Sequence, residues 1–171
     1  VVLLEGGDAV TTAFKQAGLL SLAAITVLLL IVLKSVIDTF LVLFPLALAT
    51  VFTASSSVIF GIPFNFANVI AIPLLFSLGV AYGLYLVLRE RSAESIADVM
   101  TTSTPRAILF SALTTMCSFG TLAISSHLGT ASMGQLLTIS LALALVCTLV
   151  VLPCLLACRT RYFPRTRGSR T

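Results

Sequence analysis

The sequence predicts an all-α polytopic membrane protein with five transmembrane helices. Three observations support this fold class: 58% of the 171 residues are hydrophobic, only 9% are charged, and the charged residues are clustered. A soluble domain usually carries about 25% charged residues, because polar groups must cover its surface. A composition this apolar therefore excludes an ordinary water-soluble fold.

The uncharged stretches of the chain are long enough to cross a lipid bilayer. They lie between Lys15 and Lys34, between Asp38 and Arg89, and, with His127 inside it, between Arg106 and Arg159. A helix needs about 20 apolar residues to cross the hydrocarbon core. The first stretch therefore supplies one crossing, and each of the other two supplies two crossings joined by a turn.

Two turns divide the longer stretches. Residues 61–65 combine Gly61 and Pro63 with an asparagine, and residues 125–130 read Ser-Ser-His-Leu-Gly-Thr, which are residues that interrupt helices. The five helices are accordingly expected at about residues 14–34, 37–60, 65–89, 105–126 and 131–157. We interpret residues 1–13 as the end of an extracytoplasmic domain, 14–158 as the membrane domain and 159–171 as a basic cytoplasmic tail. The chain starts without an initiator Met, so we expect it to be the C-terminal part of a larger protein.

The distribution of Lys and Arg predicts the orientation. Five crossings place the two ends of the chain on opposite sides of the membrane, with nine of the ten Lys and Arg residues on the side of the C-terminus and only Lys15 on the other. Cytoplasmic loops are enriched in Lys and Arg, so the C-terminus is expected in the cytoplasm. The basic tail is interpreted as an orientation signal that also attracts anionic lipid headgroups, not as a nucleic-acid-binding segment.

The third predicted helix carries two groups of candidate functional residues. Gly79 and Gly83 form a small-xxx-small pair, which lets two helix backbones approach closely in lipid. Ser77 and Ala81 share one face, since residues four apart stack on a helix, and Tyr82 lies beside them. Polar residues deep in a membrane helix normally face the interior of the bundle. We therefore expect this helix to be central.

The fourth predicted helix carries a stripe of hydroxyl groups, which fall in an arc about 120° wide at 100° per residue. They belong to Ser111, Thr114, Thr115, Ser118, Thr121 and Ser125. Two interpretations stay open. The hydroxyls line a water-accessible or proton-conducting seam against the third helix, or they bond to their own backbone carbonyls and hold neighbouring helices together.

The sequence shows no pattern of enzyme chemistry. No Asp, Glu, Lys or Arg lies inside a predicted helix away from its ends, and no nucleophile–base pair occurs at membrane depth. Metal-binding, P-loop and dinucleotide motifs are also absent. We therefore expect no enzymatic activity, no bound metal and no cofactor.

The motifs of the third and fourth helices resemble those of a known family. Residues 68–87 contain a Gly-Val-x-Tyr-Gly core at 79–83, and a basic loop leads from them to Arg106-Ala-Ile-Leu-Phe-Ser-Ala-Leu-Thr-Thr. Together with the five-helix layout, these stretches resemble the C-terminal membrane half of a resistance–nodulation–division (RND) transporter of the MmpL-like branch. Residues 125–134 are similar to the hopanoid-transporter group within that branch.

The resemblance implies a twelve-helix, proton-driven exporter of the bacterial inner membrane that moves lipids or other hydrophobic molecules, hopanoids among them, towards the outer envelope. The implied partners are the bilayer, a hydrophobic lipid and the missing N-terminal half of the same transporter, while a homo-oligomer stays an open question. A second interpretation is a sterol-sensing-like module that binds lipid or regulates without pumping.

The resemblance also implies roles for individual residues. Related transporters use an Asp as the proton relay at the position that Ala81 occupies here, in a Gly-x-Asp-Tyr-Gly motif, and Tyr82 matches the Tyr of that motif. The hydroxyls of Ser111, Thr114, Thr115 and Ser118 would lie where the family places helper groups of the relay. The alanine leaves open whether this half couples protons or whether the missing half carries the acid.

Overall fold

The computed structural model describes residues 2–61, 71–93 and 96–162, and every regular element within these ranges is a helix. The helices are α1 (Val2–Leu33), α2 (Val36–Ile59), α4 (Ala71–Ser92), α5 (Ile96–Thr101), α6 (Ser103–Leu122), α7 (Leu128–Val146), the π-helical η1 (Cys147–Val151) and α8 (Leu152–Tyr162). The all-α fold class is therefore confirmed. The start of the third predicted helix, the turn before it and the end of the basic tail lie outside the described residues.

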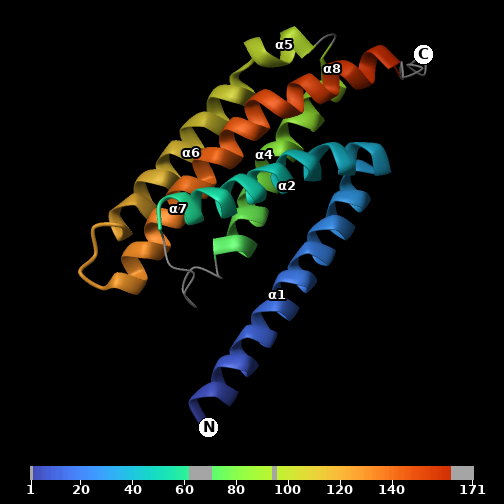
Figure 1. Cartoon of the computed structure of the whole chain (residues 1–171). Coiled ribbons are helices and arrows are strands. Elements are labelled where there is room, and N and C mark those ends of the chain that lie inside the picture. The colour runs from blue at the N-terminus through green and yellow to red at the C-terminus, as the bar shows by residue number, and fades with distance from the viewer. Residues whose placement is uncertain (1, 62–70, 94–95, 163–171) are drawn as a thin grey trace.

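Four described stretches are long and apolar enough to cross a membrane: Gln16–Leu33, Val36–Ile59, Pro73–Ser92 and Leu128–Arg159. Helix α6 has 20 residues, the length of one crossing, but its Ser and Thr residues lower its mean hydropathy. It lies alongside α7 (Figure 1). The chain is thus a multi-pass membrane protein, as its composition predicts.

The helices form one bundle around α4. Helix α1 begins at one end of the bundle, and α8 finishes at the opposite end (Figure 1). Helix α4 contacts α1, α2, α6 and α7, and 39% of its membrane-spanning window is buried. Helix α1 lies at the edge, and only 11% of its membrane-spanning window is buried. The third predicted helix therefore contacts each of the other long helices. The expectation that its polar residues face the interior holds for Tyr82 but is wrong for Ser77, which is exposed.

The two glycines of α4 lie where α2 approaches most closely. A Cβ built on Gly83 would lie 2.8 Å from Cγ1 of Val42, and one built on Gly79 would collide with the side chain of Leu46. Val42 and Leu46 are 2% and 1% exposed. Because the glycines have no side chain, these two residues of α2 pack directly on the backbone of α4.

The α6–α7 connection brings two other backbones together. A Cβ on Gly134 of α7 would lie 2.5 Å from the backbone nitrogen of Ala123, at the end of α6. Helix α7 begins immediately after His127, which occupies its N-cap position without a side-chain capping bond. Only glycine fits at position 134 without a shift of the α6 backbone.

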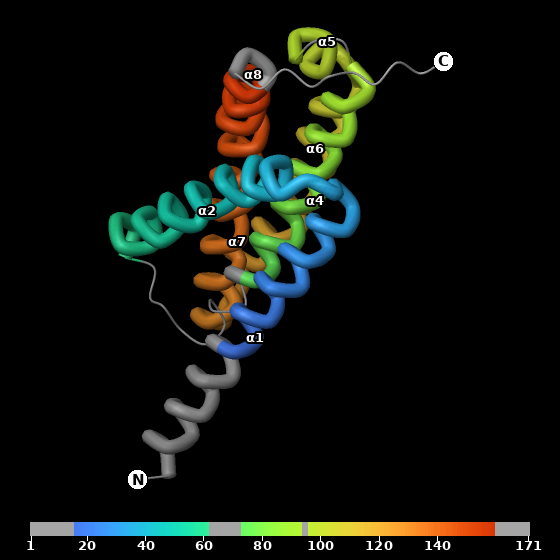
Figure 2. The backbone as a smooth tube through the Cα atoms, turned by 90° about the vertical axis from the view of Figure 1, so that its right-hand side faces the viewer, coloured from blue at the N-terminus to red at the C-terminus, as the bar shows by residue number. Residues whose placement is uncertain are grey.

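A two-residue link joins α1 to α2. Lys34 has a φ of 48°, in the left-handed region that side chains other than glycine rarely adopt. Ser35 is the N-cap of α2, and its side chain accepts a hydrogen bond from the Asp38 backbone N–H at 3.3 Å. This cap starts α2 at once, so α1 and α2 meet in a sharp corner (Figure 2).

The last crossing is interrupted by one π turn. The backbone N–H of Leu152 bonds to the carbonyl of Cys147, five residues back. Pro153 follows, and proline has no N–H to give to an α-helical bond. The additional residue in the turn rotates the rest of the helix by about 100°. The π turn therefore sets which face of α8 is turned towards α2.

Candidate functional site

A cavity of about 360 Å³ lies between α4 and α6. Tyr82 and Tyr85 of α4 line one side, and the first turns of α6 line the other with Ser103, Thr104, Ala107, Ile108 and Ser111. The short helix α5 connects the two walls and contacts both. The cavity thus brings together Tyr82 and Ser111, two of the residues that the sequence singles out, from opposite walls.

Tyr82 is a buried polar residue in the wall of this cavity. It is 4% exposed, and its hydroxyl has no hydrogen-bond partner among the described residues. An unsatisfied buried polar group costs about 1–3 kcal/mol. The Tyr82 hydroxyl is therefore a hydrogen-bonding group that the described residues leave unsatisfied.

The other candidates of α4 lie away from the cavity. Ser77 is exposed and Ala81 is half-buried, and neither lines the cavity wall. Ala81 also offers no group that exchanges a proton. Tyr82 is thus the one sequence-predicted residue of α4 that lines the same cavity as Ser111.

The hydroxyl stripe of α6 bonds mostly to its own helix. Thr114 donates to the carbonyl of Phe110 at 2.8 Å, Thr115 to that of Ser111 at 2.8 Å, and Ser118 to that of Thr114 at 3.0 Å. Thr121 donates to the Ser118 carbonyl at 2.7 Å. Except for the half-buried Thr115, these four side chains are exposed on the bundle. Of the stripe, only Ser111 lines the cavity.

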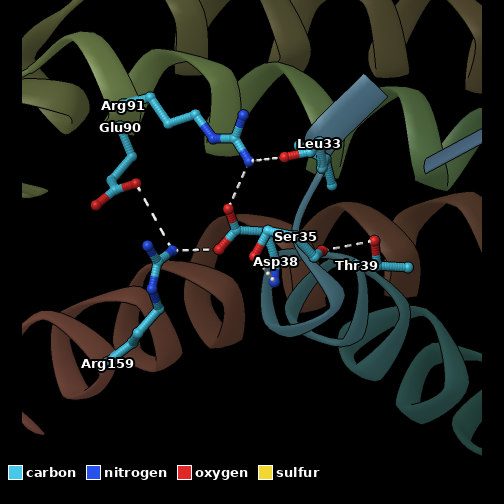
Figure 3. Close-up of polar contacts among 7 residues, drawn as sticks. All are labelled: Leu33, Ser35, Asp38, Thr39, Glu90, Arg91 and Arg159. Carbon is cyan, nitrogen blue, oxygen red and sulfur yellow. Dashed lines mark hydrogen bonds and ion pairs between the residues drawn. The ribbon is translucent and has the colours of Figure 1, made fainter. Parts of the chain in front are cut away.

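A second polar group lies at the end of the bundle where α1 meets α2 (Figure 3). Asp38 is 0% exposed and binds two arginines through separate oxygens. Its Oδ2 lies 2.6 Å from a terminal nitrogen of Arg91, and its Oδ1 lies 2.5 Å from a terminal nitrogen of Arg159. Arg91 also donates to the carbonyl of Leu33, and Arg159 lies 3.9 Å from the Glu90 carboxylate.

Sequence reasoning missed this cluster. In the sequence, Asp38 marks the boundary of an uncharged stretch, while Arg91 and Arg159 count towards the orientation. The available signal was Asp38 itself, an acid that directly precedes a long apolar run. An acid at such a place is costly unless it pairs with another group. The partners are 53 and 121 residues away along the chain, so only the fold identifies them.

Within residues 2–61, 71–93 and 96–162, no group of three or more His, Cys, Asp or Glu side chains lies close enough to hold an ion. The chemical resources of the bundle are therefore the Tyr82 cavity and the charged cluster around Asp38.

Comparison with known proteins agrees with this membrane architecture. The chain is 44% identical over 156 residues to the hopanoid transporter HpnN of Rhodopseudomonas palustris (strain TIE-1), a match that covers 91% of the chain and 18% of that protein. It is 40% identical over 150 residues to the hopanoid transporter HpnN of Burkholderia multivorans (strain ATCC 17616 / 249), covering 88% of the chain and 16% of that protein.

The chain thus spans less than a fifth of the length of these curated relatives. The model of the MMPL family matches residues 5–171, which is nearly the whole chain. The resemblance of the sequence to RND-type, MmpL-like transporters is therefore confirmed, and the chain belongs to the MMPL family.

Proposed function

We propose that the full-length protein is an RND-type transporter that moves hopanoids or similar hydrophobic lipids from the inner membrane towards the outer envelope. The observation that carries this proposal is the 44% identity to a hopanoid transporter along 91% of the chain. This chain supplies membrane helices of that transporter and performs no covalent chemistry. The remainder of the protein, including its extracytoplasmic domains, meets the lipid first.

Lipid retention tests the substrate class. The full-length protein, purified in mild detergent, is expected to retain hopanoids above their share of the surrounding membrane, as measured by mass spectrometry of extracted lipids. A membrane protein of similar size from the same cells serves as the control. Retention of bulk phospholipid in membrane proportions would remove hopanoids as the proposed substrate.

We further propose that transport is driven by protons and that Tyr82 belongs to the relay. Ala81 offers no carboxylate, whereas the Tyr82 hydroxyl is buried without a hydrogen-bond acceptor among the described residues. An acid on the missing half, facing the cavity, would accept this bond and exchange the proton. Ser111 lies on the opposite wall of the cavity and is proposed as a helper group. Ser77, Thr114, Thr115 and Ser118 lie outside the cavity wall and are proposed to have only secondary roles.

Tyr82→Phe is therefore expected to slow lipid transport by the full-length protein by about 10²-fold or more, the size of effect typical of a proton-transfer group. The change deletes one oxygen and fills the same space, so the melting temperature should stay within a few degrees of the parent. Transport is measured as the rate at which labelled lipid leaves proteoliposomes after a pH gradient is imposed. Tyr85→Phe, in the same cavity but 58% exposed, is the matched control. Equal rates for the two variants would refute the relay role.

The same assay distinguishes a transporter from a lipid-binding module that does not pump. The alanine at position 81 favours such a module, because it offers no carboxylate for a proton relay. A module of that kind would retain lipid in detergent but would release none in response to the gradient. A transporter releases lipid only when the gradient is present.

The proposed membrane is the bacterial inner membrane, with the C-terminus in the cytoplasm. The bias of Lys and Arg to the side of the C-terminus supports this orientation. A tag at the C-terminus should therefore resist protease on intact spheroplasts and be cleaved after lysis. Cleavage on intact spheroplasts would reverse the assignment.

A further inference from the structure

The charged cluster of Figure 3 connects α1, α2, α4 and α8 around one buried carboxylate. Asp38 at the start of α2 binds Arg91 at the end of α4 and Arg159 in α8. Arg91 also holds the last carbonyl of α1, that of Leu33. We infer that this cluster is a charge lock, which keeps this end of the bundle closed and opens the packed interior when it releases.

The geometry makes Asp38 the centre of the lock. Its two oxygens are divided between two helices, at 2.6 Å from Arg91 and 2.5 Å from Arg159. Its own backbone N–H is held by the Ser35 cap at 3.3 Å. The carboxylate is therefore fixed to the start of α2 while it binds α4 and α8, and loss of this one charge disconnects three elements together.

The energetics of buried charges distinguish this cluster from ordinary apolar packing between helix ends. Apolar side chains of similar volume would hold helix ends together equally well, because a buried ion pair gains little over good apolar packing. Removing one member, in contrast, leaves a buried charge uncompensated at high cost. The cluster therefore holds the helix ends together only while it is complete, and loss of one member disrupts it as a whole.

The described bundle covers little of α1. Only 11% of its membrane-spanning window is buried. Its polar attachment is the bond from Arg91 to the Leu33 carbonyl, next to Lys34 with its φ of 48°. The lock therefore sits at the corner around which α1 and α2 can change their angle. The reason for such opening rests on the proposed transport function, whereas the test below does not use transport.

A native cysteine reports on the opening. Cys147 is 3% exposed and packs with Ala49 of α2, Leu75 of α4 and Ala144 of α7. Its labelling by N-ethylmaleimide therefore requires these helices to separate. The rate is measured on the full-length protein in lipid nanodiscs, by mass spectrometry of the peptide that contains Cys147.

Asp38→Asn is expected to raise the labelling rate of Cys147 by about tenfold or more, because it removes the negative charge at the centre of the lock. Arg89→Gln is the matched control. It removes an exposed arginine two positions from Arg91 on α4 and should leave the rate within about twofold of the parent. An unchanged rate for Asp38→Asn would overturn the lock.

A double variant separates the lock from loss of stability. Asp38→Asn combined with Arg159→Gln restores charge balance, because Glu90 and Arg91 remain. The melting temperature is expected to recover towards that of the parent, whereas Cys147 stays rapidly labelled because the Asp38 carboxylate is still missing. A labelling rate that returns to the parental value with the melting temperature would show that the cluster only stabilises the fold. Absence of lipid transport by the parent would instead count against the proposed function and leave this comparison intact.

Discussion

Asp38→Ala should destabilise the protein by about 3–5 kcal/mol, the cost of leaving buried charges without their counterion. Arg159 is the more deeply buried of the two arginines, with 9% of its side chain exposed against 26% for Arg91. Truncation of Asp38 removes the carboxylate that both guanidinium groups bind, and Arg159 keeps only the more distant Glu90 carboxylate at 3.9 Å. Repulsion between the two guanidinium groups and their desolvation then act in the same direction.

This loss is measured as the change in the free energy of unfolding, from equilibrium titration in mixed detergent micelles. Arg89→Ala serves as the control for a charge at the same end of α4, and a change within about 0.5 kcal/mol is expected for it, as for other exposed charges. In a double-mutant cycle, Asp38→Ala with Arg159→Ala should cost less than the sum of the single changes, since the second deletion removes the unpaired charge left by the first. Strict additivity would contradict the pairing.

Gly134→Ala is the second change with a large expected effect. The new Cβ would lie 2.5 Å from the backbone nitrogen of Ala123 and 2.8 Å from the carbonyl carbon of Leu122. A backbone has no rotamer through which to yield, so α6 and α7 must separate. We expect a loss of about 1–3 kcal/mol, as for other overpacked contacts.

Gly120→Ala provides the comparison within the same helix pair. A Cβ at Gly120 would meet only the Thr138 hydroxyl oxygen, at 3.9 Å, which is ordinary contact. This change should be neutral, or stabilise the helix by up to about 1 kcal/mol because alanine loses less backbone entropy. Both variants are compared by thermal unfolding in the same detergent. Equal melting temperatures would show that the α6–α7 contact tolerates expansion.

The helical architecture could be predicted from the sequence because it depends on length and hydropathy alone. Stretches without charge are long enough for one or two crossings, and the helices Val36–Ile59 and Ala71–Ser92 begin or end within a few residues of the charges that bound one of them. The helix ends were harder to place. Helix α1 begins at Val2 instead of near residue 14, since hydropathy marks where a helix enters lipid and not where its backbone bonds start.

The candidate site was predictable only in part. Tyr82 and Ser111 were selected by their chemistry and lie on one cavity. The hydroxyl stripe shows the limit of such reasoning, because the 100° period tells which residues of α6 share a face but not what that face meets. Asp38 was missed for a related reason: its partners are distant in sequence, and the rotation of α8 by the π turn has no clear sequence signal apart from Pro153.

The short corner at Lys34 and Ser35 sets the angle between α1 and α2. Helix α1 has 32 residues and is therefore about 48 Å long. A change of only about 5° in its angle to α2 would displace its far end by about 4 Å, as follows from that length. A small change of angle at this corner would therefore be amplified along α1 and would displace the far end of the helix most.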